Sequence, residues 1–312
     1  MTRILITGIT GFTGVHLANH LLTQGAHVFG FSDATTELPP ALTERVSLYS
    51  GDIRHQATLE KVLAEVQPDI IYHLAGLLKA AKVEDFYQIN VLGTIALFEA
   101  IITVGLTSKV LITSSSAVYG KGVGSRPITE QFQLRPITHY GVSKVAQEAV
   151  AQRYYLTHRL PVVTTRAFNL LGPGQPPTLA CSAFARQIAL AEQSGAGGDI
   201  ITGNLSAWRD FTDVRDAVQA YELIARQGKA GDVYNVCSQQ AVSTQTCLEI
   251  LICMACVPLK ATLDPARAQA NDVPLQIGSA AKLVKQTGWR AKITLQQSLA
   301  DLLNDWRQKV RT

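Results

Sequence analysis

The sequence has little charge, few cysteines and no long apolar run. Charged residues make up 17% of its 312 residues and the net charge is +4, with the basic residues scattered, so we expect no nucleic-acid partner. No apolar run approaches the roughly 20 residues that cross a bilayer. The first residues read as a strand rather than as a signal peptide. We therefore expect a cytoplasmic protein without a membrane partner.

The five cysteines are odd in number and irregularly spaced, which argues against a disulfide framework. Cys253 and Cys256 form a C-x-x-C within the apolar stretch LEILICMACV. No second Cys or His pair lies near them in the sequence. Free cysteines commonly behave as small hydrophobic residues, so we expect both thiols to be buried and expect no metal site.

Hydrophobic residues make up 47% of the chain and come in short runs that alternate with helical stretches. Predicted strands cover residues 4–7, 27–32, 69–75, 109–116 and 161–169. Predicted helices cover residues 14–24, 57–66, 90–104 and 142–156. This alternation predicts an α/β fold, a Rossmann-type doubly wound parallel sheet with helices on both faces.

The alternation ends after Asn169, at the Pro/Gly-rich stretch GPGQPPT. We predict that residues 1–169 form a dinucleotide-binding Rossmann domain, to which segments within 205–245 return. The remaining residues, 170–204 and 246–312, are predicted to form a smaller C-terminal α/β lobe that binds the substrate.

The first predicted strand runs directly into the glycine-rich stretch TGITGFTG. Gly8 permits a tight turn, Gly11 lets the backbone approach a pyrophosphate, and Gly14 lets the next helix pack closely on the strand. The N-terminus of that helix offers free N–H groups to the anion. We predict a nicotinamide dinucleotide site here, with contacts from Gly8, Thr10, Gly11, Phe12, Thr13 and Gly14.

Further cofactor contacts are predicted where later strands end. Ser32 and Asp33 end the second strand, where an acid would bond the free ribose 2′-hydroxyl of NAD, so the sequence favours NAD over NADP. A solvated turn is the alternative role for Asp33. His73 is interpreted as a structural histidine. The other predicted cofactor contacts are Asp52, Ile53, Leu74, Ala75 and Gly76.

Two later segments carry groups suited to proton transfer. The segment SSSAVYG follows the strand KVLIT, and Tyr140 and Lys144 stand four residues apart, on one face of a predicted helix. A nearby ammonium group lowers the pKa of a phenol, so such a tyrosine can exchange a proton with a sugar oxygen while a nicotinamide exchanges a hydride. A surface pair is the alternative for this spacing taken alone.

Together these motifs resemble the extended short-chain dehydrogenases/reductases, which act mostly on nucleotide sugars. The similarity covers nearly the whole chain and rests on TGITGFTG, SSSAVYG, YGVSK, RAFNLLGPGQ, WRDFTDVRD and GDVYNV. It implies that Ser115, Tyr140 and Lys144 are catalytic, that Tyr140 and Lys144 also contact the cofactor, and that Asn90 belongs to the cofactor site. The substrate contacts that it implies are Ser116, Asn169, Arg186, Arg209 and Arg267.

Within this family the chain is most similar to reductases of GDP-4-keto-6-deoxymannose and to GDP-mannose 4,6-dehydratases. The similarity implies hydride delivery to C4 of a 4-keto-6-deoxy sugar, with GDP-D-rhamnose or a relative as product. It also implies a homodimer packed through the helix 90–104 and the helix that carries Tyr140 and Lys144. The intact Ser115, Tyr140 and Lys144 argue against a cofactor sensor without catalysis.

Two departures from the family pattern bear on the reaction. The acidic pair with which the dehydratases remove water is Ser116 and Ala117 here. Alanine cannot move a proton, so we expect a reductase, with a 4-epimerase that keeps NAD tightly bound as the alternative. The arginine that the reductases carry before the D/E-V-P segment is Gln269 here, with Arg267 two positions earlier. Either Arg267 replaces it or the diphosphate is held more weakly.

Overall fold

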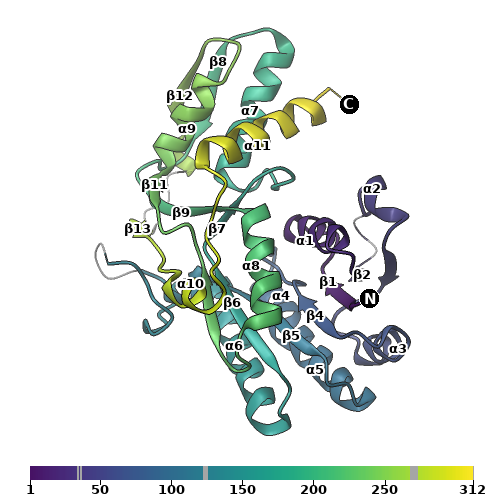
Figure 1. The fold of residues 1–312 in the computed structure, drawn as a ribbon. Helices are drawn as coiled ribbons and strands as arrows, with labels where there is room; N and C mark the ends of the chain where they lie inside the picture. The colour runs from purple at the N-terminus through teal and green to yellow at the C-terminus, as the bar shows by residue number, and fades with distance from the viewer. Residues whose placement is uncertain (34, 36, 122–125, 268–272, 312) are drawn as a thin grey trace.

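The protein is described by a computed structural model that covers all residues except 34, 36, 122–125, 268–272 and 312. Its largest unit is a parallel sheet with the strand order β10-β6-β5-β4-β1-β2-β3 (Figure 1). The predicted Rossmann-type sheet is thus confirmed, and β10 is a segment that returns to it from 205–245. The strands are β1 (Arg3–Thr7), β2 (His27–Ser32), β3 (Ser47–Ser50), β4 (Ile70–His73), β5 (Lys109–Ser115), β6 (Val162–Ala167) and β10 (Val233–Val236).

Helices cover both faces of this sheet, and each face has its own apolar core. Ile4 and Ile6 of β1 belong to one core, whereas Leu5 between them belongs to the other, because successive side chains of a strand point to opposite faces. The first core contains α1 (Phe12–Thr23), α8 (Val214–Gln227) and α10 (Ala281–Thr287). The second contains α3 (Gln56–Val66), α5 (Gly93–Val104) and α6 (His139–His158). Burial on both faces explains why the strands are continuous apolar runs.

The smaller lobe lies at the top of the view in Figure 1. Its core is formed by α7 (Ala180–Ser194), α9 (Thr244–Cys253) and α11 (Leu295–Lys309). Two small sheets complete it, one of β7 (Asn169–Leu171), β9 (Trp208–Asp213), β11 (Ala241–Ser243) and β13 (Leu275–Gln276), the other of β8 (Gly198–Thr202) and β12 (Leu259–Leu263). The segment 246–312, which we expect in the lobe, also contains α10, and α10 packs on α8 and β10 of the main domain.

The expectation for the C-x-x-C pair is wrong, since Cys253 and Cys256 are both exposed. The side chains of α9 that enter the core of the lobe are Cys247, Leu248 and Leu251, which lie on one face of the helix. Cys253 ends the helix off that face. Among the described residues, no group of three or more His, Cys, Asp or Glu is placed to hold a metal ion.

The helical stretch Val83–Val104 is long and apolar enough to cross a membrane, judged by length and composition. It consists of α4 (Val83–Tyr87), the π-helical turn η1 (Gln88–Leu92) and α5. Leu97, Phe98 and Ile101 of α5 are fully buried against the sheet. We therefore assign α5, the C-terminal part of this stretch, to the core of the protein.

The order of the sheet reverses at β1, which pairs with β2 on one side and with β4 on the other. In open α/β sheets, ligands bind outside the carboxyl ends of the strands at such a reversal. The glycine-rich turn follows β1, and the serine segment follows β5 as η2 (Ser116–Tyr119). The fold thus brings the predicted cofactor and catalytic segments to the same edge.

Candidate active site

At two key positions, the turn after β1 has room for a glycine but not for a larger residue. Gly8 has φ +73°, and a Cβ there would lie 2.7 Å from the backbone nitrogen of Ala75. A Cβ on Gly14 would clash with the carbonyl oxygen of Gly8 and would lie 2.6 Å from that of Ile9. Gly11 is the N-cap of α1, so the free N–H groups of the first turn face the space above β1. This cradle fits the diphosphate of a dinucleotide.

The predicted ribose contacts stand beside the cradle. The hydroxyl oxygens of Thr10 and Ser32 are 2.6 Å apart, which joins the glycine turn to the end of β2. Asp33 follows β2 and is exposed, and its carboxylate accepts a hydrogen bond from Thr35 at 2.7 Å. A carboxylate in this place is accessible to a ligand hydroxyl.

Asp52 and Ile53 follow β3 and differ in their surroundings. Arg54 donates hydrogen bonds to the Asp52 carboxylate, which lowers the pKa of this group to about 2. Ile53 is buried, and a Cβ on Gly93 would lie 2.8 Å from its side chain. Ile53 therefore joins the loop after β3 to the start of α5.

Asn90 is fully buried in η1 and holds the loop that follows β4. Its Oδ1 accepts from the Leu77 backbone nitrogen at 2.7 Å, and its Nδ2 donates to the Leu77 carbonyl at 3.1 Å and to Ser143 Oγ at 2.9 Å. The Nδ2 donors are thus engaged within the protein. Asn90 thus fixes the loop after β4, in which Leu74, Ala75 and Gly76 precede Leu77.

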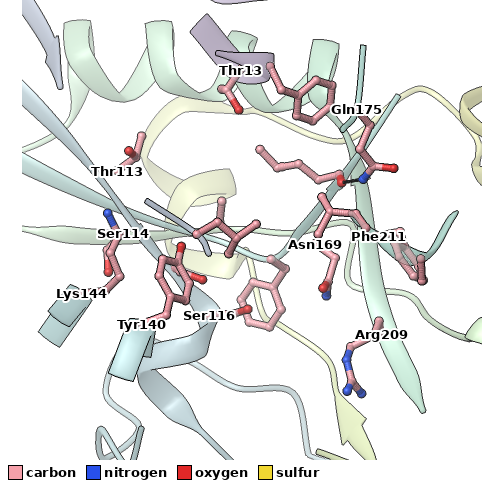
Figure 2. A pocket seen from close by; sticks show the side chains of 18 of the residues that line it. Thr13, Thr113, Ser114, Ser116, Tyr140, Lys144, Asn169, Gln175, Arg209 and Phe211 are labelled. Atoms are coloured by element: carbon pink, nitrogen blue, oxygen red, sulfur yellow. Dashed lines mark hydrogen bonds between the residues drawn. The ribbon is translucent and has the colours of Figure 1, made fainter. Parts of the chain in front are cut away.

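Ser115, Tyr140 and Lys144 all line one cavity of about 500 Å³ (Figure 2). Thr138 caps α6, since its Oγ1 accepts from the Gly141 backbone nitrogen at 3.0 Å. Tyr140 and Lys144 therefore lie one turn apart near the start of the helix. Ser115 stands at the end of β5, and its Oγ accepts from the Ala117 backbone nitrogen at 3.1 Å.

Burial sets the charge states of this pair. Desolvation raises the pKa of Tyr140, and the nearby Ser115 hydroxyl opposes that rise without cancelling it. Desolvation lowers the pKa of Lys144 to about 8, while the negative charge of Glu148 raises it. The predicted lowering of the Tyr140 pKa by Lys144 is therefore not found, and Tyr140 is a protonated phenol at neutral pH, one helical turn from an ammonium group that would stabilise its anion.

A chain of buried hydrogen bonds behind Lys144 was not predicted. Lys144 Nζ donates to Gln147 Oε1 at 2.6 Å, and Gln147 Nε2 donates to Thr94 Oγ1 at 2.8 Å. The Thr94 hydroxyl also lies 2.8 Å from His73 Nε2, and Thr7 Oγ1 lies 2.7 Å from the other ring nitrogen. Burial lowers the pKa of His73 to about 3, so the ring is neutral and structural. A glutamine three positions after Lys144 was the signal for this contact.

The other wall of the cavity comes from the lobe. Asn169 of β7 and Arg209 of β9 line it, together with Phe211 (Figure 2). Asn169 Nδ2 donates to the Asp210 carbonyl at 3.2 Å, and Arg209 Nη1 donates to the Val273 carbonyl. Both side chains lie across the cavity from Lys144, where a ligand could bridge the domain and the lobe.

A family model described as GDP-mannose 4,6 dehydratase matches residues 5–302 of the chain. The chain belongs to this family of extended short-chain dehydrogenases/reductases. The GDP-6-deoxy-D-mannose reductase of Pseudomonas aeruginosa is 35% identical, over 99% of this chain and 98% of that protein. The dTDP-6-deoxy-L-talose 4-dehydrogenase (NAD(P)(+)) of Kitasatospora kifunensis is 28% identical, over 96% of this chain and 94% of that protein.

Solved structures of extended short-chain dehydrogenases/reductases have the same fold over the whole chain. The RMD protein of P. aeruginosa complexed with NADPH has a TM-score of 0.85 at 32% identity, and covers 99% of this chain and 100% of its own. The UDP-glucose 4-epimerase of Thermus thermophilus in complex with NAD has a TM-score of 0.84 at 25% identity, and covers 98% and 99%. The two cofactors differ, so these structures leave the choice between NAD and NADP open.

Ser116 and Ala117, at the two positions for which the family similarity implied an acidic pair in dehydratases, begin η2. The Ser116 hydroxyl donates to Gln276 Oε1 at 3.0 Å, and Gln276 Nε2 donates back to the Ser116 carbonyl at 2.9 Å. Gln276 belongs to β13, so this reciprocal pair joins the Rossmann domain to the lobe. Gln276 and Ser116 are 160 residues apart in the chain, so no local sequence pattern could predict this contact.

Two arginines that the family similarity implied as substrate contacts lie outside the described lining of the cavity. Arg186 is exposed on α7, with its guanidinium 6.0 Å from the centre of the Trp306 ring. The Arg267 side chain is 58% exposed and pairs with Asp264 at 3.1 Å. Gln269, where the chain departs from the reductases, lies outside the described residues.

Proposed function

We propose that the protein is an NAD(P)H-dependent reductase of a nucleotide-activated 4-keto-6-deoxy sugar, with GDP-4-keto-6-deoxymannose as substrate and GDP-D-rhamnose as product. The observation that carries this proposal is the meeting of Ser115, Tyr140 and Lys144 at a cavity whose described lining contains no Asp or Glu. A ketone reductase needs a proton donor and an orienting hydroxyl, whereas a dehydratase also needs acid and base groups to remove water. The similarity to the P. aeruginosa reductase over the whole chain supports the same choice.

The residues have distinct roles in this reaction. A reduced nicotinamide cofactor, held by the glycine turn and by Lys144, would supply the hydride that the carbonyl carbon C4 of the sugar needs. Tyr140 donates its phenolic proton to the carbonyl oxygen, so the ketone becomes a secondary alcohol. The Ser115 hydroxyl bonds the same oxygen and fixes its position, while the Lys144 ammonium stabilises the phenolate that remains. Arg209 and Asn169 are proposed to hold the nucleotide part, for which a guanidinium offers a fork of donors to diphosphate oxygens.

The reductase assay is the first test. The protein is incubated with GDP-4-keto-6-deoxymannose and either NADH or NADPH, and the loss of reduced nicotinamide absorbance and the product mass are followed. We expect one cofactor oxidised for each product molecule, which gains two hydrogens. Absence of oxidation with both cofactors would contradict the proposal. Isomerisation of UDP- or GDP-hexoses by protein that retains its own NAD would then identify a 4-epimerase.

We propose that NADH is preferred, because the exposed Asp33 carboxylate suits a 2′-hydroxyl and repels a 2′-phosphate. Asp33→Ser should weaken NADH binding by about tenfold, the loss expected for a hydrogen bond to a charged group, and should leave NADPH binding equal or tighter. Titration calorimetry with both cofactors measures this. Glu37→Ser, which removes a second exposed acid of the same loop, is the matched control and should change neither affinity. Tighter binding of NADPH than of NADH by the unaltered protein would contradict the preference.

We also propose a homodimer that resides in the cytoplasm and packs through the α5 and α6 side of the sheet. Leu92 at the end of η1 is 46% exposed, and Val142 and Leu156 of α6 are 39% and 61% exposed. These exposed apolar side chains lie on two elements that contact each other, and the proposed dimer contact would cover them.

A further inference from the structure

Gln147 is a fully buried residue of α6 that contacts Lys144 and to which the reaction above gives no role. Its Oε1 accepts from Lys144 Nζ at 2.6 Å. Among the described residues, this oxygen is the one hydrogen-bond acceptor that the ammonium group has. An ammonium group carries three N–H donors, so two of them remain for a ligand in the cavity that Lys144 lines.

The direction of the hydrogen bonds behind Lys144 follows from one backbone carbonyl. Thr94 has a single hydroxyl proton, which it donates to the Asn90 carbonyl at 2.8 Å. The Thr94 oxygen therefore accepts from its two other partners, Gln147 Nε2 and His73 Nε2, each at 2.8 Å. A flipped Gln147 amide would turn its oxygen toward the Thr94 oxygen and its N–H₂ group toward the ammonium group. The oxygen end of this amide is thus fixed toward Lys144.

The same hydrogen-bonded chain reaches the strand that leads into the glycine turn. With its proton on Nε2, the neutral His73 ring accepts at Nδ1 from Thr7 Oγ1 at 2.7 Å, and Thr7 Oγ1 accepts from the Ala75 backbone nitrogen at 3.3 Å. Thr7 ends β1 and directly precedes Gly8. Every side chain between Thr7 and the ammonium group is fully buried. The chain therefore fixes the place of Lys144 relative to the cradle that fits the diphosphate.

We propose that Gln147 is a positioning residue, which keeps the ammonium group of Lys144 charged and directed into the cavity that Tyr140 also lines. A charge taken out of water is costly unless its N–H groups find acceptors. Gln147 supplies an acceptor without a negative charge, so the full charge of Lys144 remains available to the phenolate that forms on Tyr140. The inference rests on the role of Lys144 in the proposed function and does not depend on which sugar is reduced.

The other titratable groups around Lys144 have assigned charge states. Glu148 of α6 carries a negative charge that raises the pKa of Lys144 against desolvation. His73 of β4 is neutral because burial lowers its pKa to about 3, and burial raises the pKa of Tyr140. The residues that η1 and α5 contribute to the hydrogen-bonded chain are uncharged. Lys144 is thus the group of this cluster that changes charge near pH 8, and its titration reports on Gln147.

The test follows the ionisation of Lys144 in the full chain with no sugar present. The protein is labelled with carbon-13 at the lysine ε-carbons and titrated by NMR, and the Lys144 signal is identified by its loss in Lys144→Arg. Gln147→Met keeps the length of the side chain but removes the acceptor, and should lower the midpoint by about one pH unit, the size expected for one hydrogen bond to a charged group. Gln147→Glu places a negative charge at the same atoms and should raise the midpoint.

Gln175→Met is the matched control. Gln175 is also buried and lines the same cavity, but its Nε2 donates to the Leu170 carbonyl at 2.6 Å, the dashed line in Figure 2, on the opposite side of the view from Lys144. This variant should leave the midpoint of Lys144 unchanged.

Turnover measured across pH is the second readout, and its alkaline limb should move with the midpoint in each Gln147 variant. Midpoints that stay in place, or that move in the same direction in both variants, would overturn the inference, because a merely structural defect has no reason to depend on the sign of the new charge. A limb that stays in place while the midpoint moves would also overturn it. Midpoints that move in opposite directions beside a failed reductase assay would instead contradict only the choice of substrate.

Discussion

Replacement of Tyr140 by phenylalanine is expected to lower turnover of the 4-keto sugar by about 10²–10⁴-fold, the usual contribution of a positioned proton donor. The phenol is protonated at neutral pH because burial raises its pKa, and it lines the same cavity as the Ser115 hydroxyl. The variant keeps the ring and loses the transferable proton. Steady-state kinetics give the loss of turnover, and calorimetry should show little change in cofactor affinity.

Tyr221→Phe is the matched control for this experiment. Tyr221 lines the same cavity from α8, and its pKa is raised strongly by burial. The Tyr221→Phe variant loses one phenolic hydroxyl but keeps the proposed proton donor Tyr140, so its turnover should stay near that of the unaltered enzyme. Comparable activity of the two variants would show that Tyr140 is not the proton donor.

The parts of this site that the sequence predicts are those that depend on local spacing. Gly8 and Gly14 lie on either side of a single turn, and Tyr140 and Lys144 share one helix face. The chemistry of these residues can be inferred because the backbone geometry of a strand, turn or helix fixes their relation. The same reasoning recovered the alternation of the main sheet, since hydrophobic periodicity is local.

The parts that the sequence does not predict depend on contacts between distant segments. Gln276 meets Ser116 only after the lobe has packed on the sheet. Gln175 Oε1 has no partner among the described residues, and this too can be seen only in the packed structure. Arg186 and Arg267 were implied as substrate contacts by similarity alone. They lie outside the described lining of the cavity, near Trp306 and Asp264, so their role stays a prediction.

The buried ion pair of Glu148 and Arg166 joins α6, the helix that carries Tyr140 and Lys144, to β6 of the sheet. Both carboxylate oxygens are used, at 2.9 Å from Nε and 2.6 Å from Nη2, and the two side chains are only 9% and 6% exposed. Arg166 also donates to the Tyr119 hydroxyl at 2.9 Å and to the Glu130 carbonyl at 3.1 Å. If Glu148 is neutralised, these neutral partners remain, and the guanidinium charge is left buried without its counter-ion.

Glu148→Gln is therefore expected to lower the free energy of unfolding by about 3–5 kcal/mol, the usual cost of removing one partner of a buried pair. Denaturant titration followed by circular dichroism measures the change. Glu99→Gln is the control on the neighbouring helix. Glu99 faces Arg153 at 3.8 Å with both side chains substantially exposed, and a glutamine oxygen can still accept the hydrogen bond that Tyr154 donates to Glu99, so this variant should cost about 0–1 kcal/mol. Equal losses of unfolding free energy in the two variants would mean that the buried Glu148–Arg166 pair stabilises the fold no more than an exposed pair does.

The same variant should move the alkaline limb of the activity profile to lower pH. The negative charge of Glu148 raises the pKa of Lys144, which burial has lowered to about 8. Without that charge the pKa falls further, so Lys144 loses its proton at a lower pH and ceases to stabilise the Tyr140 phenolate. Turnover measured across pH in the folded fraction separates this effect from the loss of stability, because unfolding reduces the amount of active enzyme without displacing the limb. A limb that stays in place would show that Glu148 acts on the stability of the fold alone.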